Sequence, residues 1–208
     1  MIQSVTAGLV STNCYLLIDE KTKLGALIDC PCDSQVIDDM VENAGLERLQ
    51  YILLTHGHYD HIMGLEKMKE RTGAEILIHE QDAPCLLDAM KSLAVFRGCS
   101  HPACPADRLL RDGDTVTLGT LDIQVVHTPG HTLGGVCFVV EDAIFSGDTL
   151  FFETVGRTDL PGGSYAVTLE SLRKLDALPG DYKIYPGHGR TSTLDYEREA
   201  NMYFKEAR

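Results

Sequence analysis

Short apolar runs separated by polar turns dominate the first half of the chain. Residues 13–19 and 24–29 are rich in β-favouring side chains, and the polar segment 20–23 between them predicts a β-hairpin with a longer loop. Two more apolar runs predict strands at 50–54 and 75–78. Apolar residues at helical spacing predict helices over 36–44, 62–71 and 81–93, the last of them despite Pro84 near its first turn.

The second half repeats this alternation after an irregular stretch. Residues 95–107 show no period and contain several glycines and prolines, which predicts a long surface loop, and a second glycine-rich loop is predicted at 154–164. Ser164 can cap a helix that runs to about residue 176, and a capping-box pattern at 192–195 predicts a C-terminal helix. Strands are predicted at 115–118, 122–127, 136–140, 143–145 and 183–185.

The order of these elements predicts the fold class. Strands alternate with helices, and no proline-, glycine- or serine-rich linker divides the chain. A β-rich half over residues 1–90 is followed by a similar half over 110–208. A chain of 208 residues can bury a sizeable core without disulfides. The sequence therefore predicts one α/β domain over residues 1–208, built from two similar halves.

One stretch, residues 55–61, concentrates groups that bind metals. It follows an apolar run, and it holds His56, His58, Asp60 and His61. In extended backbone alternate residues point to one side, so we expect His56, His58 and Asp60 to share a face while Tyr59 turns away and packs. Imidazole and carboxylate groups are good ligands of zinc and of iron.

Three later turns carry further candidate ligands. His131, Asp148 and His188 each follow a predicted strand and lie beside a glycine, where the backbone can bend tightly. So many ligands exceed the needs of one ion, and a carboxylate such as Asp148 can bridge two ions through its two oxygens. The candidate first site is His56, His58, His131 and Asp148. The candidate second site is Asp60, His61, Asp148 and His188.

Charge and cysteine content narrow the class of protein. The formal net charge of −13 opposes unaided binding to nucleic acid and to anionic membranes, so we expect neither as a partner. No apolar run approaches the ~18 residues of a membrane span, and the N-terminus lacks the features of a secretory signal. The seven cysteines have no disulfide-like spacing and fit a reducing compartment. We therefore expect a cytoplasmic protein.

Four motifs, in their order along the chain, resemble the metallo-β-lactamase superfamily. They are Thr-His-x-His-x-Asp-His at 55–61, Thr-Pro-Gly-His-Thr at 128–132, Ser-Gly-Asp-Thr at 146–149 and Pro-Gly-His-Gly at 186–189. The resemblance covers nearly the whole chain. It implies an αββα sandwich, in which two mixed β-sheets lie face to face, helices cover the outside and the metals lie at one edge. It also implies two divalent metal ions, most simply zinc, with iron or a mixed pair as the alternatives.

Within the superfamily, the chain looks most like the compact glyoxalase II-like hydrolases. It has Asp148 where several zinc β-lactamases carry cysteine, and its loop at 155–163 is similar to one found in compact bacterial glyoxalase II-like proteins. In this loop, Arg157 and Asp159 are candidates for an ion pair that orders the loop or supports the ligands. Twenty residues follow His188, so we do not expect the helical domain that helps longer glyoxalase II enzymes to hold glutathione.

The glyoxalase II resemblance implies hydrolysis of a small-molecule thioester such as S-lactoylglutathione. Two divalent ions ~3.5–4 Å apart lower the pKa of a shared water from about 15.7 toward ~7, which supplies a nucleophile at neutral pH. Asp60 is the candidate catalytic residue, because it can orient that nucleophile by hydrogen bonding. A thiolate leaving group needs no separate general acid, since thiols have a pKa near ~8.5.

Three other functions, two enzymatic and one not, remain as alternatives. An iron-dependent persulfide dioxygenase would keep the same motif and hold one iron with the counterparts of His56, His131 and Asp148, and ligand types alone do not separate zinc from iron. A lactonase or β-lactamase would attack another kind of carbonyl. A metal-binding protein without turnover is the non-enzymatic alternative. The cluster around Cys99 and Cys104 lacks the full ligand set of a further metal site. We expect Cys30 and Cys32 to lie in a turn with two small thiols, and redox activity or metal binding are the alternatives for this pair.

Overall fold

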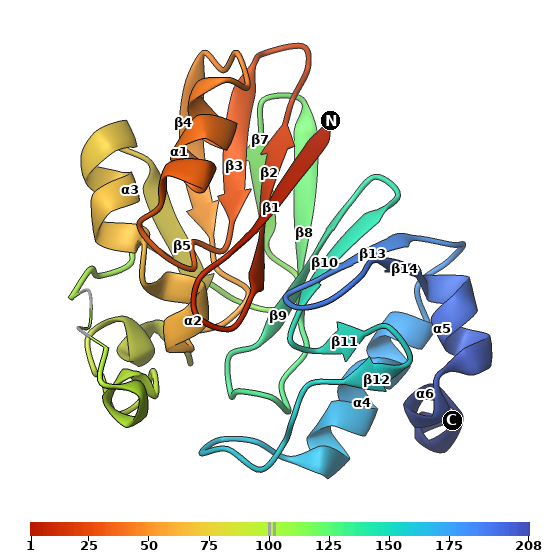
Figure 1. Ribbon diagram of the computed structural model, residues 1–208. Helices are drawn as coiled ribbons and strands as arrows, with labels where there is room; N and C mark the ends of the chain where they lie inside the picture. Colours follow the sequence, from red (N-terminus) through yellow and green to blue (C-terminus); the bar gives the residue numbers. More distant parts are fainter. Residues whose placement is uncertain (100, 102) are drawn as a thin grey trace.

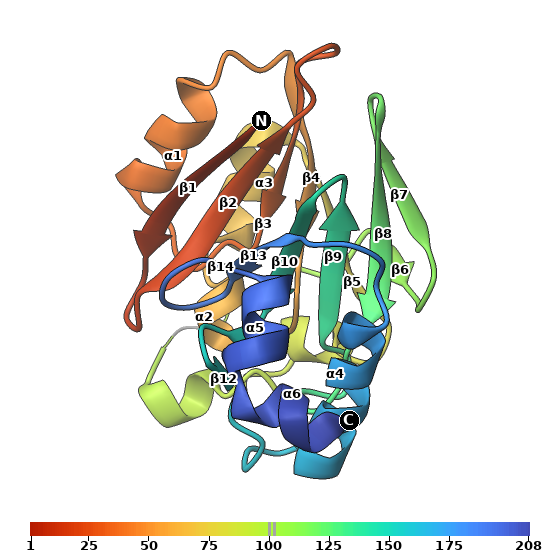
Figure 2. The ribbon, with the colours of Figure 1, turned by 90° about the vertical axis from the view of Figure 1, so that its right-hand side faces the viewer.

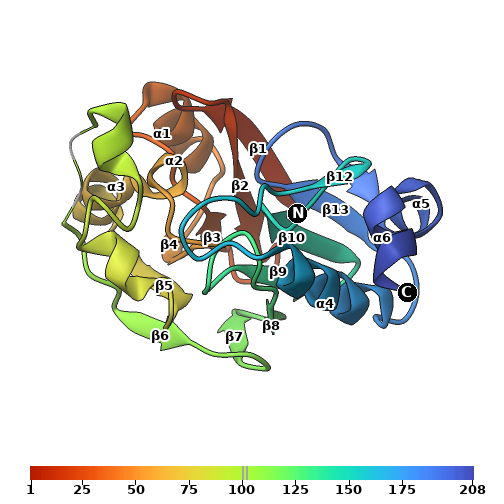
Figure 3. The same cartoon turned by 90° about the horizontal axis from the view of Figure 1, so that it is seen from below.

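Two six-stranded β-sheets lie face to face, and helices cover their outer faces (Figure 1). This computed structural model describes residues 1–99, 101 and 103–208. Seen from below, the layers follow one another as helices, sheet, sheet and helices (Figure 3). The predicted α/β class and the αββα sandwich are confirmed. None of the helices in the described ranges has the length and apolar character that a membrane crossing requires.

The first half of the chain builds the first sheet, in the order β1-β2-β3-β4-β5-β6. Its strands are β1 (Ile2–Ala7), β2 (Thr12–Ile18), β3 (Leu24–Ile28), β4 (Arg48–Leu53), β5 (Glu75–His79) and β6 (Arg108–Leu110). Strand β2 pairs antiparallel with both β1 and β3, and β3 to β6 run parallel to one another. Helices α1 (Gln35–Glu42) and α3 (Leu65–Thr72) connect parallel strands and lie on the outer face (Figure 1).

The second half builds the second sheet, in the order β14-β13-β10-β9-β8-β7. Its strands are β7 (Thr115–Leu118), β8 (Leu121–His127), β9 (Val136–Val140), β10 (Ala143–Gly147), β13 (Lys183–Pro186) and β14 (Ser192–Thr193). Strands β10 and β13 are parallel, because α4 (Tyr165–Asp176) returns the chain between them. Helices α4, α5 (Leu194–Ala200) and α6 (Met202–Ala207) cover this sheet (Figure 2).

Three apolar clusters fill the spaces between the layers, because the central strands are buried on both faces. Neighbouring residues of a strand point to opposite sides. In β9, Phe138 lies in the cluster between the sheets, whereas Val139 lies in the cluster that contains Leu172 of α4. In β2, Leu17 faces the second sheet and Leu16 lies in the cluster beneath α1 and α3. The runs of apolar residues in the sequence are therefore strands with no solvent-facing side.

The predicted helix over 81–93 is wrong. This segment holds a single 3₁₀ turn, Ala83–Leu86, with Pro84 inside it, followed by further turns. Two carboxylates explain the difference, because Asp82 accepts hydrogen bonds from two loops outside the segment and Asp88 accepts one from the N–H of Met90. Helical spacing was present, but the local side chains stabilise turns instead.

Several element boundaries also differ from the predictions. Strands β1 and β6 were not predicted, and neither was the hairpin of β11 (Leu150–Phe151) and β12 (Thr154–Val155). The predicted helix 62–71 is two helices, α2 (Tyr59–Ile62) and α3, and the C-terminal helix is α5 followed by α6, with Thr193 as the cap. The predicted loop 95–107 begins with a 3₁₀ turn, Ala94–Arg97, and its residues 100 and 102 lie outside the described residues.

Candidate metal centre

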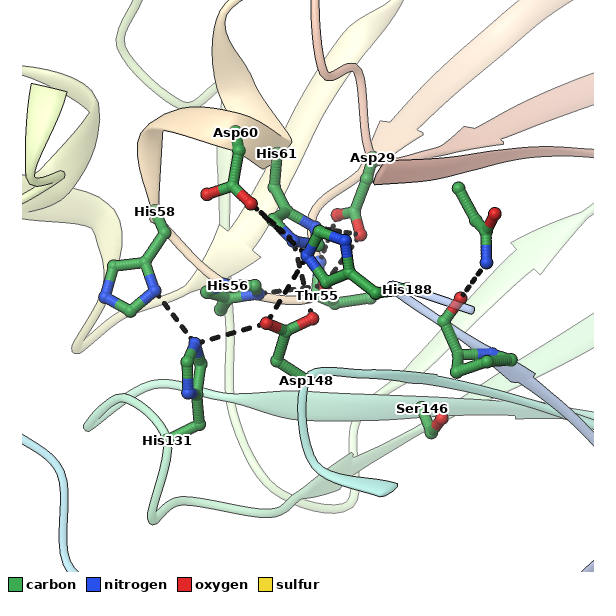
Figure 4. Close-up of polar contacts among 12 residues, drawn as sticks. Asp29, Thr55, His56, His58, Asp60, His61, His131, Ser146, Asp148 and His188 are labelled. Atoms are coloured by element: carbon green, nitrogen blue, oxygen red, sulfur yellow. Dashed lines mark hydrogen bonds and ion pairs between the residues drawn. The ribbon is translucent and has the colours of Figure 1, made fainter. Parts of the chain in front are cut away.

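All the predicted ligands converge at one edge of the sandwich, where four strands end (Figure 4). His56 and His58 follow β4, and Asp60 and His61 lie in α2. His131 follows β8, Asp148 follows β10 and His188 follows β13. One strand of the first sheet therefore leads to four ligands, and three strands of the second sheet lead to one ligand each. Side chains from residues 56 to 188 meet in one place because both sheets present the carboxyl ends of these strands.

The ligand atoms fall into overlapping groups, each with its atoms within 4.8 Å of one another. The first group is His56, His58 and His131, the second is His56, His61 and Asp148, and the third is Asp60, His61 and His188. Asp148 lies between the first group and the third. Its Oδ2 is 3.4 Å from the Nε2 of His131 and 3.6 Å from that of His188, and its Oδ1 is 3.5 Å from the Nε2 of His61. A carboxylate in this position can contribute one oxygen to each side.

Three buried polar atoms that could bind a metal have no hydrogen-bond partner among the described residues. They are the Nε2 of His56, the Nε2 of His61 and the Oδ1 of Asp148. His56 and His61 are almost completely buried. Buried polar atoms are normally paired, since leaving one unpaired costs about 1–3 kcal/mol. Cations between these atoms would satisfy all three, so the donor set fits metal ions.

Two of the histidines, His56 and His58, are kept in the neutral form that binds metals. The Nδ1 of His58 lies 2.9 Å from the Nε2 of His131, so these two ring nitrogens face one another. Burial, and then the neighbouring His131, lower the pKa of His58 to about 3. Burial and the surrounding imidazoles likewise hold the pKa of His56 well below its usual range.

The group around His61 has the opposite balance of charge. Burial alone would lower the pKa of His61, but Asp29, Asp60 and Asp148 surround it and raise that pKa to about 10. Burial alone would raise the pKa of Asp60, but His61 and His188 hold it well below its usual range. This part of the centre therefore attracts a positive charge, which an ion would supply in place of the proton on His61.

Asp29 supports His61 and was missed by the sequence analysis. Its Oδ2 lies 2.7 Å from the Nδ1 of His61, and it accepts hydrogen bonds from the N–H and the hydroxyl of Thr55, both at 2.8 Å. The Nε2 of His61 is thereby directed into the cluster. A carboxylate at the end of the apolar run 24–29 was the available signal. The backbone of Asp29 is in the left-handed region, with φ of 59°, so the extended conformation of β3 ends before this residue.

The loop at 155–163 supports His131 through its backbone. The Nδ1 of His131 lies 2.8 Å from the carbonyl oxygen of Arg157. Arg157 in turn pairs with Asp159 through two contacts of 2.7 Å. Both side chains of this pair are more than half exposed, so the ion pair contributes little to the free energy of unfolding. It links two residues of the loop whose carbonyl contacts His131.

Tyr59 is placed differently from the prediction. Extended backbone ends at His58, and helix α2 begins at Tyr59. Asp60 and His61 therefore project from a helical turn, and Tyr59 lines the cavity beside the ligands rather than packing away from it.

His188 is held in place from the opposite sheet. The backbone N–H of Asn13 in β2 donates to the carbonyl of Gly187 at 2.7 Å, and its side-chain amide donates to the carbonyls of Pro186 and Gly189. A side chain at Gly187 would put its Cβ 2.3 Å from the Oδ1 of Asp148, so this position requires glycine. Contacts between the two sheets thus fix the last ligand.

A cavity of about 730 Å³ opens onto the ligands. The ligands that line it are His58, Asp60, His131, Asp148 and His188. Apolar side chains from three loops supply much of the remaining wall. A polar, charged end and an apolar wall are the common composition of sites for small molecules. An αββα sandwich that carries this donor set beside such a cavity has the architecture of a metallohydrolase.

Comparison with known proteins identifies the family. The profile described as the metallo-beta-lactamase superfamily matches residues 7–188. The chain belongs to this superfamily.

Three curated relatives cover most of the chain. An uncharacterized protein of Mycobacterium leprae is 34% identical, with 99% of both chains covered. The probable metallo-hydrolase YqgX of Bacillus subtilis is 33% identical over 94% of this chain and 93% of its own length. The hydroxyacylglutathione hydrolase of Brucella ovis is 38% identical, but it is longer, so that 85% of this chain matches 61% of it.

Solved structures share the fold over nearly the full chain. The BLEG-1 B3 metallo-β-lactamase superposes with a TM-score of 0.91 at 31% identity, covering 98% of this chain and 99% of that one. TTHA1623, solved in a di-iron-bound form, gives 0.84 at 33% identity, with 96% and 98% covered. ETHE1 from Myxococcus xanthus gives 0.81 at 30% identity, with 98% and 88% covered.

Proposed function

We propose that this protein is a thioester hydrolase of the hydroxyacylglutathione hydrolase type that uses two divalent metal ions, most simply zinc. The observation that carries the proposal is the position of Asp148, whose Oδ2 lies between His131 and His188 and whose Oδ1 lies beside His61. The likeness to the hydroxyacylglutathione hydrolase of Brucella ovis favours a thioester as the substrate.

Two groups of residues would hold the ions. His56, His58 and His131 would hold one, Asp60, His61 and His188 would hold the other, and Asp148 would contribute to both. When bound, the ions supply a water of lowered pKa and a positive charge opposite the substrate carbonyl.

The residues of the chain position the reacting groups. Asp60 lies 3.3 Å from the Nε2 of His188 through one oxygen, which leaves its second oxygen to orient the attacking water. In the overall reaction a C–O bond forms and the C–S bond breaks. The acyl group becomes a carboxylic acid that keeps the oxygen and one proton of the water, and the second proton ends on the departing thiol. Because a thiolate is a good leaving group, no other acid is needed at the cavity.

Turnover of S-lactoylglutathione, with zinc and iron measured on the same sample, tests this proposal. We expect hydrolysis by protein that carries about two metal ions per chain. His56→Ala should lower turnover more than about a hundredfold while the circular dichroism spectrum stays unchanged. His127→Ala is the matched control, since this histidine stacks on His79 outside the ligand groups and should leave turnover largely intact.

Two results would contradict the proposal. One is a single iron per chain with oxygen uptake on a persulfide and no thioester hydrolysis, which would indicate the dioxygenase alternative. The other is metal binding without turnover on thioester, lactone and β-lactam substrates. The likeness to TTHA1623 in its di-iron-bound form makes the metal analysis necessary, because histidine and carboxylate ligands suit both metals.

A further inference from the structure

The wall of the cavity is largely apolar and partly exposed. Its apolar lining residues are Val10, Leu93, Phe96, Phe151, Leu160 and Pro161. Phe96 is 69% exposed and Val10 is 37% exposed. Large apolar side chains exposed together beside a charged centre indicate a surface that an apolar ligand covers. They come from separate parts of the chain, the β1–β2 turn and the loops around residues 93–97 and 151–161.

Arg97 is the cation that the cavity leaves available. Two arginines line the cavity, and Arg157 is already paired with Asp159 through both its Nε and its Nη2. Arg97 forms no ion pair with any carboxylate in residues 1–99, 101 and 103–208, although the chain has 31 acidic residues for 18 basic ones. Its guanidinium lies beside Tyr59, the residue that begins α2.

The turn that carries Phe96 and Arg97 is fixed to the metal centre. The backbone N–H of Tyr59 donates to the carbonyl of Ser92 at 2.8 Å, which joins the turn to the ligand-bearing helix. Leu93 begins the turn in the left-handed region, with φ of 66°. This conformation costs a residue with a Cβ about 1–2 kcal/mol, and such strain is concentrated at ligand-binding segments. The strain is consistent with a turn shaped for a ligand.

We propose that the substrates are thioesters with an extended apolar acyl group on a thiol that carries one carboxylate. This inference rests on the proposed thioester hydrolysis. Phe96 and Leu160 contact the acyl chain, and Arg97 binds the carboxylate. Glutathione brings two carboxylates and an ammonium group, whereas the described lining offers one unpaired guanidinium and a mainly apolar wall. S-lactoylglutathione is then a substrate of the same reaction type but not the best one.

A series of acyl thioesters of N-acetylcysteine, from acetyl to octanoyl, tests the apolar wall. We expect kcat/KM to rise about three- to fourfold for each added methylene until the wall is covered. Phe96→Ala should flatten this increase, with the largest loss of kcat/KM for the octanoyl thioester. Leu87→Ala is the matched control, because Leu87 is also a largely exposed apolar residue of the same region but does not line the cavity.

The corresponding thioesters of N-acetylcysteamine lack the carboxylate and test Arg97. We expect the wild-type protein to favour the N-acetylcysteine series about tenfold through KM, as one charge-assisted hydrogen bond would provide. Arg97→Gln should remove this preference by raising KM for the N-acetylcysteine series. Arg111→Gln, which alters an exposed arginine paired with Glu80, should leave it unchanged.

Binding of the uncleavable thioether S-octyl-N-acetylcysteine separates this inference from the proposed reaction. Calorimetric titration should show binding that Phe96→Ala and Arg97→Gln each weaken. Binding of this kind without turnover of any thioester would support the recognition and overturn the hydrolase. Turnover of S-lactoylglutathione with no dependence on acyl length or on Arg97 would overturn the recognition and leave the hydrolase in place.

Discussion

Asp29 fixes the orientation of His61, although Asp29 is not itself one of the candidate ligands. It holds the Nδ1 of His61 at 2.7 Å and is itself held by Thr55, so the imidazole can neither rotate nor change tautomer freely. Partners of this kind make a ligand more basic and fix its direction. They cannot be recognised from a metal-ligand motif, because they touch the ligand and not the ion.

The isosteric substitution Asp29→Asn tests this role at the residue scale. We expect metal affinity to fall about 10- to 100-fold, because the negative charge that faces His61 is lost while its shape is kept. A competition titration with a metal chelator measures the change. Asp122→Asn removes an exposed carboxylate of β8 that bonds to Thr117 and serves as the control. Equal metal affinity of the two variants would show that Asp29 has no part in the centre.

The candidate ligands can be assigned from the sequence, but the residues that support them cannot. His56, His58, Asp60 and His61 stand within six residues, and that density is rare without a metal. Asp29 has one weak local signal, its position at the end of an apolar run, and Asp82 has none. Their roles depend on groups to which they are joined only in space.

At the scale of elements, the segment 81–93 joins two loops that carry ligands. The Oδ2 of Asp82 accepts a hydrogen bond from the N–H of Gly57 at 2.9 Å, and its Oδ1 accepts one from Gly134 at 2.7 Å. The first loop carries His56 and His58, and the second follows His131. Asp82 is almost completely buried, so both bonds are protected from water. The carboxylate thus connects the ends of β4 and β8.

Asp82→Ala should therefore affect both stability and the metal centre. Two buried N–H groups lose their acceptor, which we expect to lower the free energy of unfolding by about 2–4 kcal/mol. Metal affinity should fall as the two loops separate. Urea denaturation and chelator competition measure these effects. Asp88→Ala, which removes a local turn contact in the same segment, should cause a much smaller loss of stability. Equal losses in the two variants would contradict the connecting role.

At the scale of the whole molecule, Asp19 joins the two sheets at a hairpin end. It follows β2 and accepts hydrogen bonds from the N–H and the hydroxyl of Thr120, 101 residues away in the β7–β8 turn. Hydrogen bonds from the hydroxyl of Thr22, and then from the N–H of Thr120, hold the pKa of Asp19 well below its usual range. The ionised carboxylate is thus the form that the folded protein prefers.

This depressed pKa predicts a particular dependence of stability on pH. The contribution of Asp19 is fully present above the pKa of an unfolded aspartate, about 3.9, and is lost as the pH falls toward the lower folded value. Asp19→Asn should therefore be less stable than the wild type at pH 7, with a difference that shrinks below about pH 4. Urea denaturation at pH 7, 5 and 3.5 measures it. A difference of constant size across this range would contradict the prediction.

Local sequence patterns are enough to predict the alternating α/β class and the list of candidate ligands. Runs such as 136–140 are apolar on every residue, which is typical of a strand buried on both faces, and the ligands are chemically distinctive groups at strand ends. Only the folded chain shows which side chains support the ligands, where α2 begins and what lines the cavity. Those features arise from contacts between residues far apart in the chain, as Asp29 with His61 and Asn13 with Gly187, and local sequence patterns carry no record of them.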